Sequence, residues 1–255
     1  MVDAHSHILP RFDDGAKDLD TSLAMLKESY KQGIGTVIST SHCYPKCEED
    51  IAEFVGRRER RLRELEQAYA QNGGEGLPKI VAGCELNLMT DVSRFSNLDK
   101  LCVAGTNYIL LEMPYTKWNE TLFDIIYKVK ISGLEPVMAH IDRFLYQDRA
   151  MLNALFELDV YYQVNAEAFL DKKSRRQVAE LMENGTIHVL GSDMHNMSSR
   201  PPQLGKAMEI CGAEFGGALD CFKDNGRRLA AGESLGEVRG RLGKRRGLFA
   251  KLFGK

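Results

Sequence analysis

The sequence lacks the features that mark membrane-spanning or disulfide-stapled proteins. Its apolar runs fall well short of the roughly 20 residues that cross a bilayer. The first residues, Val2 to His5, do not resemble an export signal, and the six cysteines lack the dense spacing of a secreted scaffold. We therefore expect a cytoplasmic protein whose thiols are reduced.

The sequence also has little net charge, −2 over 255 residues, which gives no indication of nucleic-acid binding. The charge is unevenly distributed, because residues 238–255 carry seven basic side chains and no acidic one, leaving −9 for residues 1–237. Length and an apolar content of 44% suit one large α/β domain. We predict a domain over 1–237 and a basic amphipathic tail over 238–255.

The tail has two interpretations. Leucines and phenylalanines lie among its charges, so it could make a peripheral contact with anionic lipid or with an acidic partner, near the inner face of the membrane. The plainer interpretation is a solvated C-terminus. The oligomeric state is left open.

Short apolar runs alternate with amphipathic stretches along the chain. The runs cover residues 2–5, 36–40, 79–85, 108–112, 136–140, 160–165 and 187–192. Seven strands that alternate with helices predict a parallel sheet, and at this length a barrel is favoured. Gly133 and Gly185 each follow a helical stretch, where a left-handed residue is expected.

Histidines and acids gather at the ends of these runs. They are His5, His7, Asp14, His42, Glu85, Glu112, His140, Asp193 and His195. The C-terminal ends of barrel strands form one face, so these side chains are predicted to converge there. Any one of them alone could be a polar side chain that faces solvent at the end of a strand. Imidazoles and carboxylates together are typical metal ligands, so the set predicts a metal cluster, whereas His188, inside its run, is predicted to be structural.

Two arginines lie close to these candidate ligands in the sequence. Arg143 follows His140 by three residues, and Arg200 follows His195 by five. A guanidinium group matches phosphate oxygens in a bidentate manner. A single arginine of this kind is more often a surface residue, but the pair predicts a phosphate-binding site.

The motifs that carry these residues resemble the PHP (polymerase and histidinol phosphatase) superfamily. Within it they are most similar to the manganese-dependent protein-tyrosine phosphatases of bacterial capsular and exopolysaccharide operons. The resemblance runs from residue 2 to about residue 230. It rests on His-Ser-His-Ile-Leu-Pro with Asp13-Asp14-Gly15, Ser-Thr-Ser-His42, Gly-Cys-Glu85-Leu, Leu-Leu-Glu112-Met-Pro, Ala-His140-Ile-Asp-Arg143-Phe and Gly-Ser-Asp193-Met-His195 with Arg200-Pro.

The resemblance implies a distorted (β/α)7 barrel of the PHP type that holds two or three metal ions, Mn²⁺ or alternatively Fe, Zn or Mg. It implies one site of His5, His7, Glu85 and Asp193, a second of Glu85, Glu112 and His140, and a third of Asp14, His42 and His195. Arg143 and Arg200 would hold the phosphate while metal-activated water attacks phosphorus. We predict Asp13 as a proton donor. The implied substrate is a phosphotyrosyl protein, a bacterial tyrosine kinase that controls polysaccharide synthesis.

The chain departs from the family pattern at two motifs. It has His140-Ile-Asp-Arg143-Phe144 where the family usually has His-Pro-Glu-Arg-Tyr, and Thr-Ser-His42-Cys43 in place of Thr-Pro-His-His. The ligands persist, whereas the loops near Phe144 and Cys43, which bear on substrate preference, differ from the family pattern.

Two rival functions remain open at this point. One is histidinol phosphatase or another small-molecule phosphoesterase of the same superfamily, and the other is a metal-stabilised, non-catalytic scaffold. Four aromatics near the expected mouth could stack on a phenyl ring and favour the tyrosine phosphatase: Phe12, Tyr115, Trp118 and Phe144. The scaffold is disfavoured because binding alone would not need both arginines.

Two further motifs suggest other chemistry only weakly. Cys221 and Arg227 have the spacing of cysteine-dependent phosphatases, but they lie in a late polar stretch without the expected phosphate loop. Cys43 and Cys47 beside His42 provide only two thiols for a zinc site.

Overall fold

A computed structural model describes residues 1–71 and 76–240 of the chain. Its strands are β1 (Val2–Ser6), β2 (Thr36–Ser39), β3 (His42–Cys43), β4 (Lys79–Ala82), β5 (Glu85–Asn87), β6 (Tyr108–Glu112), β7 (Glu135–Met138), β8 (Tyr161–Asn165) and β9 (Val189–Gly191). The pairings of these strands are parallel, in the orders β1-β2-β4 and β3-β5-β6-β7-β8-β9.

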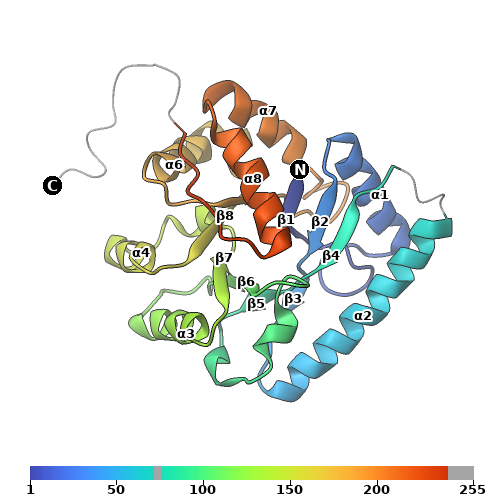
Figure 1. The fold of residues 1–255 in the computed structure, drawn as a ribbon, viewed down its shortest axis with the longest axis horizontal. Helices are drawn as coiled ribbons and strands as arrows, with labels where there is room; N and C mark the ends of the chain where they lie inside the picture. Colours follow the sequence, from blue (N-terminus) through green and yellow to red (C-terminus); the bar gives the residue numbers. More distant parts are fainter. Residues whose placement is uncertain (72–75, 241–255) are drawn as a thin grey trace.

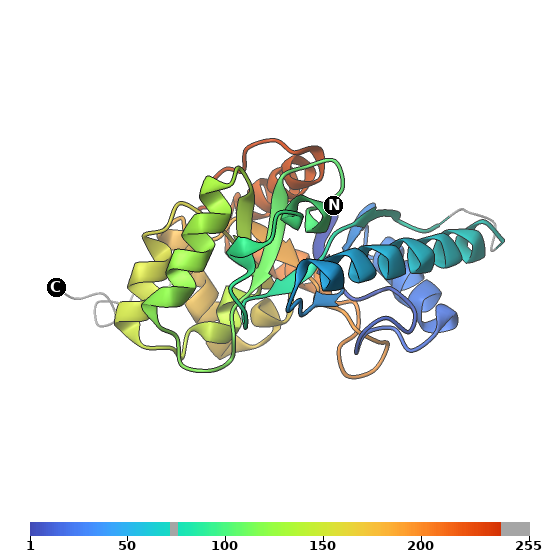
Figure 2. The same ribbon diagram turned by 90° about the horizontal axis from the view of Figure 1, so that it is seen from below.

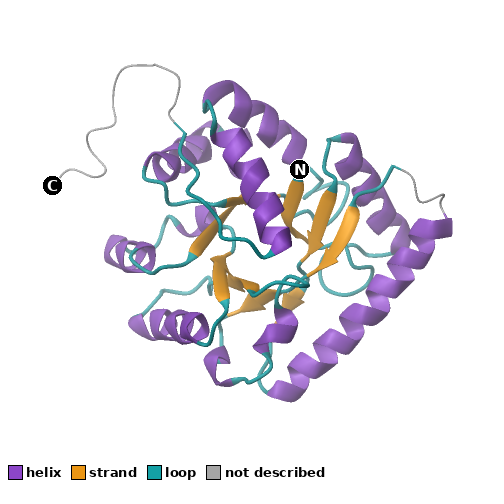
Figure 3. Ribbon diagram, viewed as in Figure 1, coloured by secondary structure: helices purple, strands orange, loops and turns teal. Residues whose placement is uncertain are grey.

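Helices surround the strands, which occupy the middle of the molecule (Figure 3). The α-helices are α1 (Leu19–Lys31), α2 (Glu48–Gln71), α3 (Glu120–Ile131), α4 (Arg149–Phe156), α5 (Glu167–Leu170), α6 (Lys172–Glu183), α7 (Leu204–Glu214) and α8 (Ala218–Ala231). Short 3-10 helices are η1 (Val92–Arg94), η2 (Leu98–Leu101) and η3 (Ile141–Phe144). Figures 1 and 2 show α2 along one side of the molecule, next to α1.

Each of the seven predicted strands is confirmed, and two are followed or interrupted by a break. The predicted strand 36–40 corresponds to β2, and a further strand, β3, follows it at His42, whereas the predicted strand 79–85 is divided between β4 and β5. Pairing continues across the breaks, because the amide of Thr40 donates to Ser6 O (2.8 Å) and that of Glu85 to Ser41 O (3.2 Å). These breaks let the sheet bend sharply while its backbone groups stay paired.

The sheet curls so that its last strand approaches its first. Beyond β9, Asp193 N donates to His5 O (2.8 Å) and His7 N to Met194 O (2.9 Å). A small apolar cluster joins side chains of six strands (β1, β2, β4, β6, β7 and β9) to Leu229 of α8 and to Leu235. Side chains from so many strands meet only inside a curl, so the fold is an α/β fold with a curled parallel sheet.

Local signals set several element boundaries. Gly133 after α3 and Gly185 after α6 have φ values of 94° and 69°, as predicted for left-handed residues that follow a helix. Asp18 caps α1 by accepting a hydrogen bond from Thr21 N at 2.8 Å. The ends of these helices are therefore set by residues close to them in the sequence.

The segment after α8 packs against the body of the molecule. Val238 is fully buried, and its amide donates to Ile187 O at 3.2 Å. The packed chain thus reaches at least one residue past the predicted boundary at 237, and residues 241–255 of the predicted tail lie outside the described residues. Over 1–71 and 76–240, the longest apolar helical windows fall short of what a membrane crossing needs.

His188 is structural, as predicted, and it gives the fold a pH dependence. Its Nδ1 accepts a hydrogen bond from Tyr162 N (3.2 Å), and its ring packs edge-on against Tyr161. Burial lowers the pKa of His188 from 6.5 to about 4. The native state therefore disfavours the protonated form, which could no longer accept that bond.

We expect the His188 contribution to stability to be fully present above pH 6.5 and lost as the pH falls from 6.5 to about 4. The shift corresponds to a loss of about 3 kcal/mol. His188→Asn keeps an acceptor without a titrating ring, so urea unfolding of this variant should show a shallower loss of stability between pH 7 and pH 4.5. Equal slopes for the two proteins would contradict the assignment.

Candidate metal centre

The structure brings all nine predicted ligands together at the C-terminal ends of the strands. They come from β1 and the residue after it, the loop before α1, β3, β5, β6, and the segments after β7 and β9. Two of them, His140 (φ 30°) and Asp193 (φ 52°), have left-handed backbones although neither is glycine. Such conformations are costly and concentrate at functional sites.

Glu85 lies at the centre of this cluster and is fully buried. Its Oε2 lies 3.2 Å from His5 Nε2, 3.3 Å from His7 Nε2 and 3.0 Å from His42 Nδ1, and its Oε1 lies 2.8 Å from His140 Nε2. Burial opposes the charge on Glu85, but His5, His140 and His42 outweigh it and hold its pKa well below the usual range. One carboxylate thus contacts four imidazoles.

Asp193 faces the histidines with one oxygen and the arginines with the other. Its Oδ1 lies 3.5 Å from the Nε2 atoms of both His5 and His7. Its Oδ2 accepts from Arg143 Nη2 (2.8 Å) and from Arg200 Nη2. The two predicted phosphate-binding residues are therefore held at the edge of the ligand cluster by a ligand candidate.

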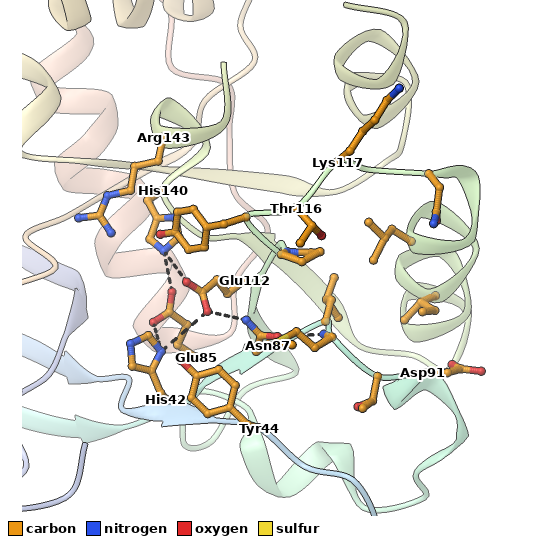
Figure 4. Close-up of a pocket in the computed structure, with 18 of the residues that line it drawn as sticks. His42, Tyr44, Glu85, Asn87, Asp91, Glu112, Thr116, Lys117, His140 and Arg143 are labelled. Carbon is orange, nitrogen blue, oxygen red and sulfur yellow. Dashed lines mark hydrogen bonds and ion pairs between the residues drawn. The ribbon is translucent and has the colours of Figure 1, made fainter. Parts of the chain in front are cut away.

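The remaining candidates form two adjoining groups. Asp14 Oδ1 lies 3.5 Å from His42 Nε2 and 3.4 Å from His195 Nε2. Glu112 Oε1 lies 3.6 Å from His140 Nε2, and its Oε2 lies 3.9 Å from His42 Nδ1 (Figure 4). Donor atoms close enough to share a cation occur in three sets: His7, Asp14, His42 and His195; His5, His7 and Asp193; and His42, Glu85 and Glu112.

These three sets differ in detail from the implied ones. His7 joins the set of Asp14, and His42 lies within reach of both Glu85 and Glu112. The rings of His7 and His195 are only 3.9 Å apart between centroids, which brings His7 into the set of Asp14 and His195. His7 and His42 each belong to two sets, whereas His140 belongs to none of the three.

The cluster has the chemistry of a cation site. Buried atoms without a hydrogen bond include His42 Nδ1, Glu85 Oε2 and His195 Nε2, although each lies beside another ligand candidate. The Nε2 atoms of His5 and His7 approach to 3.1 Å. Buried polar atoms left in this way are costly, and divalent cations satisfy imidazole nitrogens and carboxylate oxygens together. The residues therefore fit a bound metal cofactor.

The acidic neighbours of His7 favour the protonated form of its ring. Burial opposes a charge on His7, but hydrogen bonds to Asp13 and Glu85 raise the pKa of His7 to about 10. A metal ion needs the unprotonated imidazole, so metal binding at this cluster would release protons.

Asp13 lies under the cluster and supports it. Its Oδ2 accepts from His7 Nδ1 (2.9 Å) and His42 N (3.0 Å), and its Oδ1 accepts from Gly15 N (3.0 Å). Both carboxylate oxygens are therefore engaged by donors. Burial opposes the charge of Asp13, but the contact with His7 outweighs it and lowers the pKa of Asp13 below its usual range.

Sequence reasoning missed the amide side chains that hold the ligands. Gln163 Oε1 lies 3.1 Å from His5 Nδ1 and accepts from His140 N at 2.7 Å. Asn165 Nδ2 donates to Asp193 Oδ2 (3.0 Å), and Asn87 Nδ2 donates to Glu112 Oε2 (2.7 Å). The signal was present, because Gln163 and Asn165 are polar residues two apart in a predicted buried strand.

A cavity of about 790 Å³ opens onto the cluster. Figure 4 shows His42, Glu85, Glu112 and His140 at its inner end, with Tyr44 and Arg143 beside them. Of the four predicted mouth aromatics, Tyr115 lines this cavity, whereas Trp118 and Phe144 are buried in the core behind it. Phe12 lines a neighbouring cavity of about 570 Å³. Tyr44, which the sequence did not single out, lines both cavities.

The two weak cysteine motifs do not form sites. Cys221 and Arg227 both lie within α8, so no phosphate loop separates them. Cys43 is buried and Cys47 exposed, and the ligand groupings found over residues 1–71 and 76–240 contain no cysteine. All six thiols are free, as expected.

Comparisons with known proteins identify relatives that match nearly the whole chain. Residues 1–229 match the family model for capsular polysaccharide synthesis, CpsB/CapC. The tyrosine-protein phosphatase CpsB of Streptococcus pneumoniae is 30% identical over 244 residues, covering 90% of this chain and 98% of that protein. The tyrosine-protein phosphatase YwqE of Bacillus subtilis is 27% identical over 261 residues, covering 98% and 99%.

The fold has a solved counterpart. A crystal structure from work on YwqE of B. subtilis and CpsB of S. pneumoniae, described as metal-dependent tyrosine phosphatases, superposes with a TM-score of 0.78. It covers 96% of this chain and 100% of its own, at 24% identity, and so supports the curled α/β fold. The match over residues 1–229 and the 30% identity over nearly the whole length establish that the chain belongs to the CpsB/CapC family of capsular polysaccharide synthesis.

Proposed function

We propose that the protein is a metal-dependent phosphatase that removes phosphate from phosphotyrosine in a protein substrate. The observation that carries the proposal is the convergence of nine imidazole and carboxylate side chains with two arginines at one end of a large cavity. The curated relatives that match nearly the full length of the chain are tyrosine-protein phosphatases. A tyrosine kinase involved in polysaccharide synthesis is the substrate protein we propose.

We propose His5, His7, Asp14, His42, Glu85, Glu112, His140, Asp193 and His195 as the ligands of two or three ions, with Mn²⁺ as the working metal. The three overlapping donor sets support two or more ions. Mixed nitrogen and carboxylate donors suit Mn²⁺, and they also suit Fe²⁺ or Zn²⁺. Bound cations would activate water and offset the negative charge of the phosphoryl oxygens.

Arg143 and Arg200 bind the phosphoryl oxygens in this proposal. Each guanidinium contacts Asp193 through one Nη2 atom, which leaves further N–H donors for a phosphate. Asp193, which accepts a hydrogen bond from Asn165, holds the guanidinium groups close to the cluster. The arginines thereby fix the orientation of the phosphate before reaction.

We also propose that the curled sheet is a distorted (β/α)7 barrel with one catalytic domain over about residues 1–237. The contacts between β1 and the segment after β9 support closure of the sheet. Continuity of β2 with β3 and of β4 with β5 supports seven units rather than nine.

The direct test is phosphate release from a phosphotyrosyl peptide and from histidinol phosphate, each with added manganese and with EDTA. We expect manganese-dependent release from the peptide and little from histidinol phosphate. Preference for histidinol phosphate would instead assign the protein as a small-molecule phosphatase. Metal binding without release from either substrate would favour the non-catalytic scaffold.

The role of Asp13 has its own test, because the geometry favours Asp13 as a residue that positions His7 over Asp13 as a proton donor. Both oxygens of Asp13 already accept hydrogen bonds, so no proton is available for a leaving group. We expect Asp13→Asn to lower kcat by about 10- to 100-fold, as for other groups that orient a ligand histidine. The loss should be the same for p-nitrophenyl phosphate and for phenyl phosphate.

A proton donor would give another pattern. Phenolate is a poorer leaving group than p-nitrophenolate, so removal of a general acid would slow phenyl phosphate much more strongly. A larger loss on phenyl phosphate would restore Asp13 as the predicted proton donor. Metal content should be measured in parallel, because a displaced His7 weakens cation binding.

A further inference from the structure

Two exposed tyrosines lie next to two histidines that contact different oxygens of Glu85. Tyr44 follows β3 and packs against the His42 ring with centroids 5.4 Å apart. Tyr115 follows β6 and lies over the His140 ring at 6.4 Å. His42 contacts one oxygen of Glu85 and His140 contacts the other, so the two tyrosines lie on different sides of the cluster.

Both tyrosines line the cavity that leads to the cluster, yet each ring is more than half exposed, at 56% for Tyr44 and 55% for Tyr115. Because both residues are exposed within the cavity lining, their rings are accessible to a molecule that enters the cavity. Other aromatics close to the site, such as Phe144 and Trp118, are buried and serve as packing.

Neighbouring residues hold both tyrosines in place. The Tyr115 ring packs on Phe144 with centroids 5.1 Å apart, and its carbonyl accepts a hydrogen bond from Tyr146 OH at 3.1 Å. The carbonyl of Pro45, next to Tyr44, accepts a hydrogen bond from Thr90 Oγ1 at 2.8 Å. The Tyr115 ring is therefore supported by Phe144 and the Tyr44 ring by His42, which lowers the cost of ordering these side chains when a ligand binds.

We propose that Tyr44 and Tyr115 hold the aromatic ring of the substrate between them and make the site selective for aryl over alkyl phosphomonoesters. The inference rests on the proposed phosphatase function, and it names the residues that set its substrate class. A ring between the two walls would stack on aromatic faces, while its phosphate reaches the arginines and the ligand cluster. An alkyl phosphate offers no face to either wall.

The experiment is a calorimetric titration of the manganese-loaded protein with phenylphosphonate and with methylphosphonate. Neither compound is hydrolysed, so the result does not depend on turnover. We expect phenylphosphonate to bind more tightly, and Tyr44→Ala or Tyr115→Ala to weaken its binding by about tenfold. Binding of methylphosphonate should change less than about twofold.

Matched variants separate the ring from other roles. Tyr44→Phe and Tyr115→Phe keep the ring and should retain the preference for phenylphosphonate. Tyr127→Ala removes an exposed tyrosine of α3 outside the cavity lining and should change neither affinity. Equal weakening of both phosphonates, or no weakening, would overturn the inference.

The same titration distinguishes this inference from the proposed function. One outcome is a protein that prefers phenylphosphonate through the two tyrosines yet releases no phosphate from phosphotyrosyl peptide. That result would support the aryl-binding site and contradict the phosphatase function. A protein that releases phosphate but shows no dependence on Tyr44 or Tyr115 would retain the function and lose the aryl site.

Discussion

Glu85→Gln is expected to lower kcat/KM on a phosphotyrosyl peptide by about 10³-fold, or about 4 kcal/mol in the barrier. Glutamine fills almost the same volume but carries no charge, and one of its terminal atoms is a donor facing imidazoles. Glu85 contacts His5, His7, His42 and His140, so the loss of its charge should affect every part of the cluster. Metal content and steady-state kinetics are the measurements.

Manganese bound per chain should fall together with activity, since Glu85 belongs to one donor set and contacts His5 and His7 of the others. Glu167→Gln is a suitable control because Glu167 is exposed on α5, away from the cavity lining. It should leave both metal content and kinetics unchanged. A Glu85→Gln protein with full metal content and full activity would remove Glu85 from the proposed ligands.

Arg200→Ala is expected to lower kcat/KM by about 10²- to 10³-fold, as for loss of one group that stabilises developing charge. The side chain is about one third exposed, and its Nη2 contacts Asp193, so it is held close to the cluster while it remains open to the cavity. Inhibition by inorganic phosphate should weaken in parallel, because the same guanidinium would bind the product. Arg200→Lys should recover only part of the loss, since an ammonium group cannot bind bidentately.

Two controls make this result interpretable. Arg176→Ala removes an exposed arginine of α6 and should have no effect. Metal content should stay near normal in Arg200→Ala, because Arg143 and Asn165 still hold Asp193. Reduced metal content with unchanged phosphate inhibition would mean that Arg200 acts only through Asp193.

Much of the fold was predictable because its signals are local. Apolar runs of strand length, helical periodicity and glycines such as Gly133 and Gly185 depend on neighbours within a few residues. The splits that produce β3 and β5 were not predictable, because the bend at each is set by pairing across strands. Burial of Val238 was missed for the same reason, since Ile187 lies far from it in the sequence.

The sequence by itself determined that the nine candidate ligands lie together at one face of the fold. Histidines and carboxylates at successive strand ends must meet when parallel strands align, because the C-terminal ends of such strands share one face. This rule placed His5, Glu85, His140 and Asp193 together without any distance being known.

Only the tertiary structure decided how these residues are arranged. Glu85 contacts four imidazoles, and Asp193 divides its oxygens between histidines and arginines. Gln163 supports both His5 and His140. These contacts depend on side chains brought together from across the chain. The tertiary structure likewise decided that Tyr44 lies at the cavity and Phe144 in the core. Strand periodicity fixes which face of the sheet a side chain occupies, whereas its contacts and exposure follow from three-dimensional packing, which has no local sequence signal.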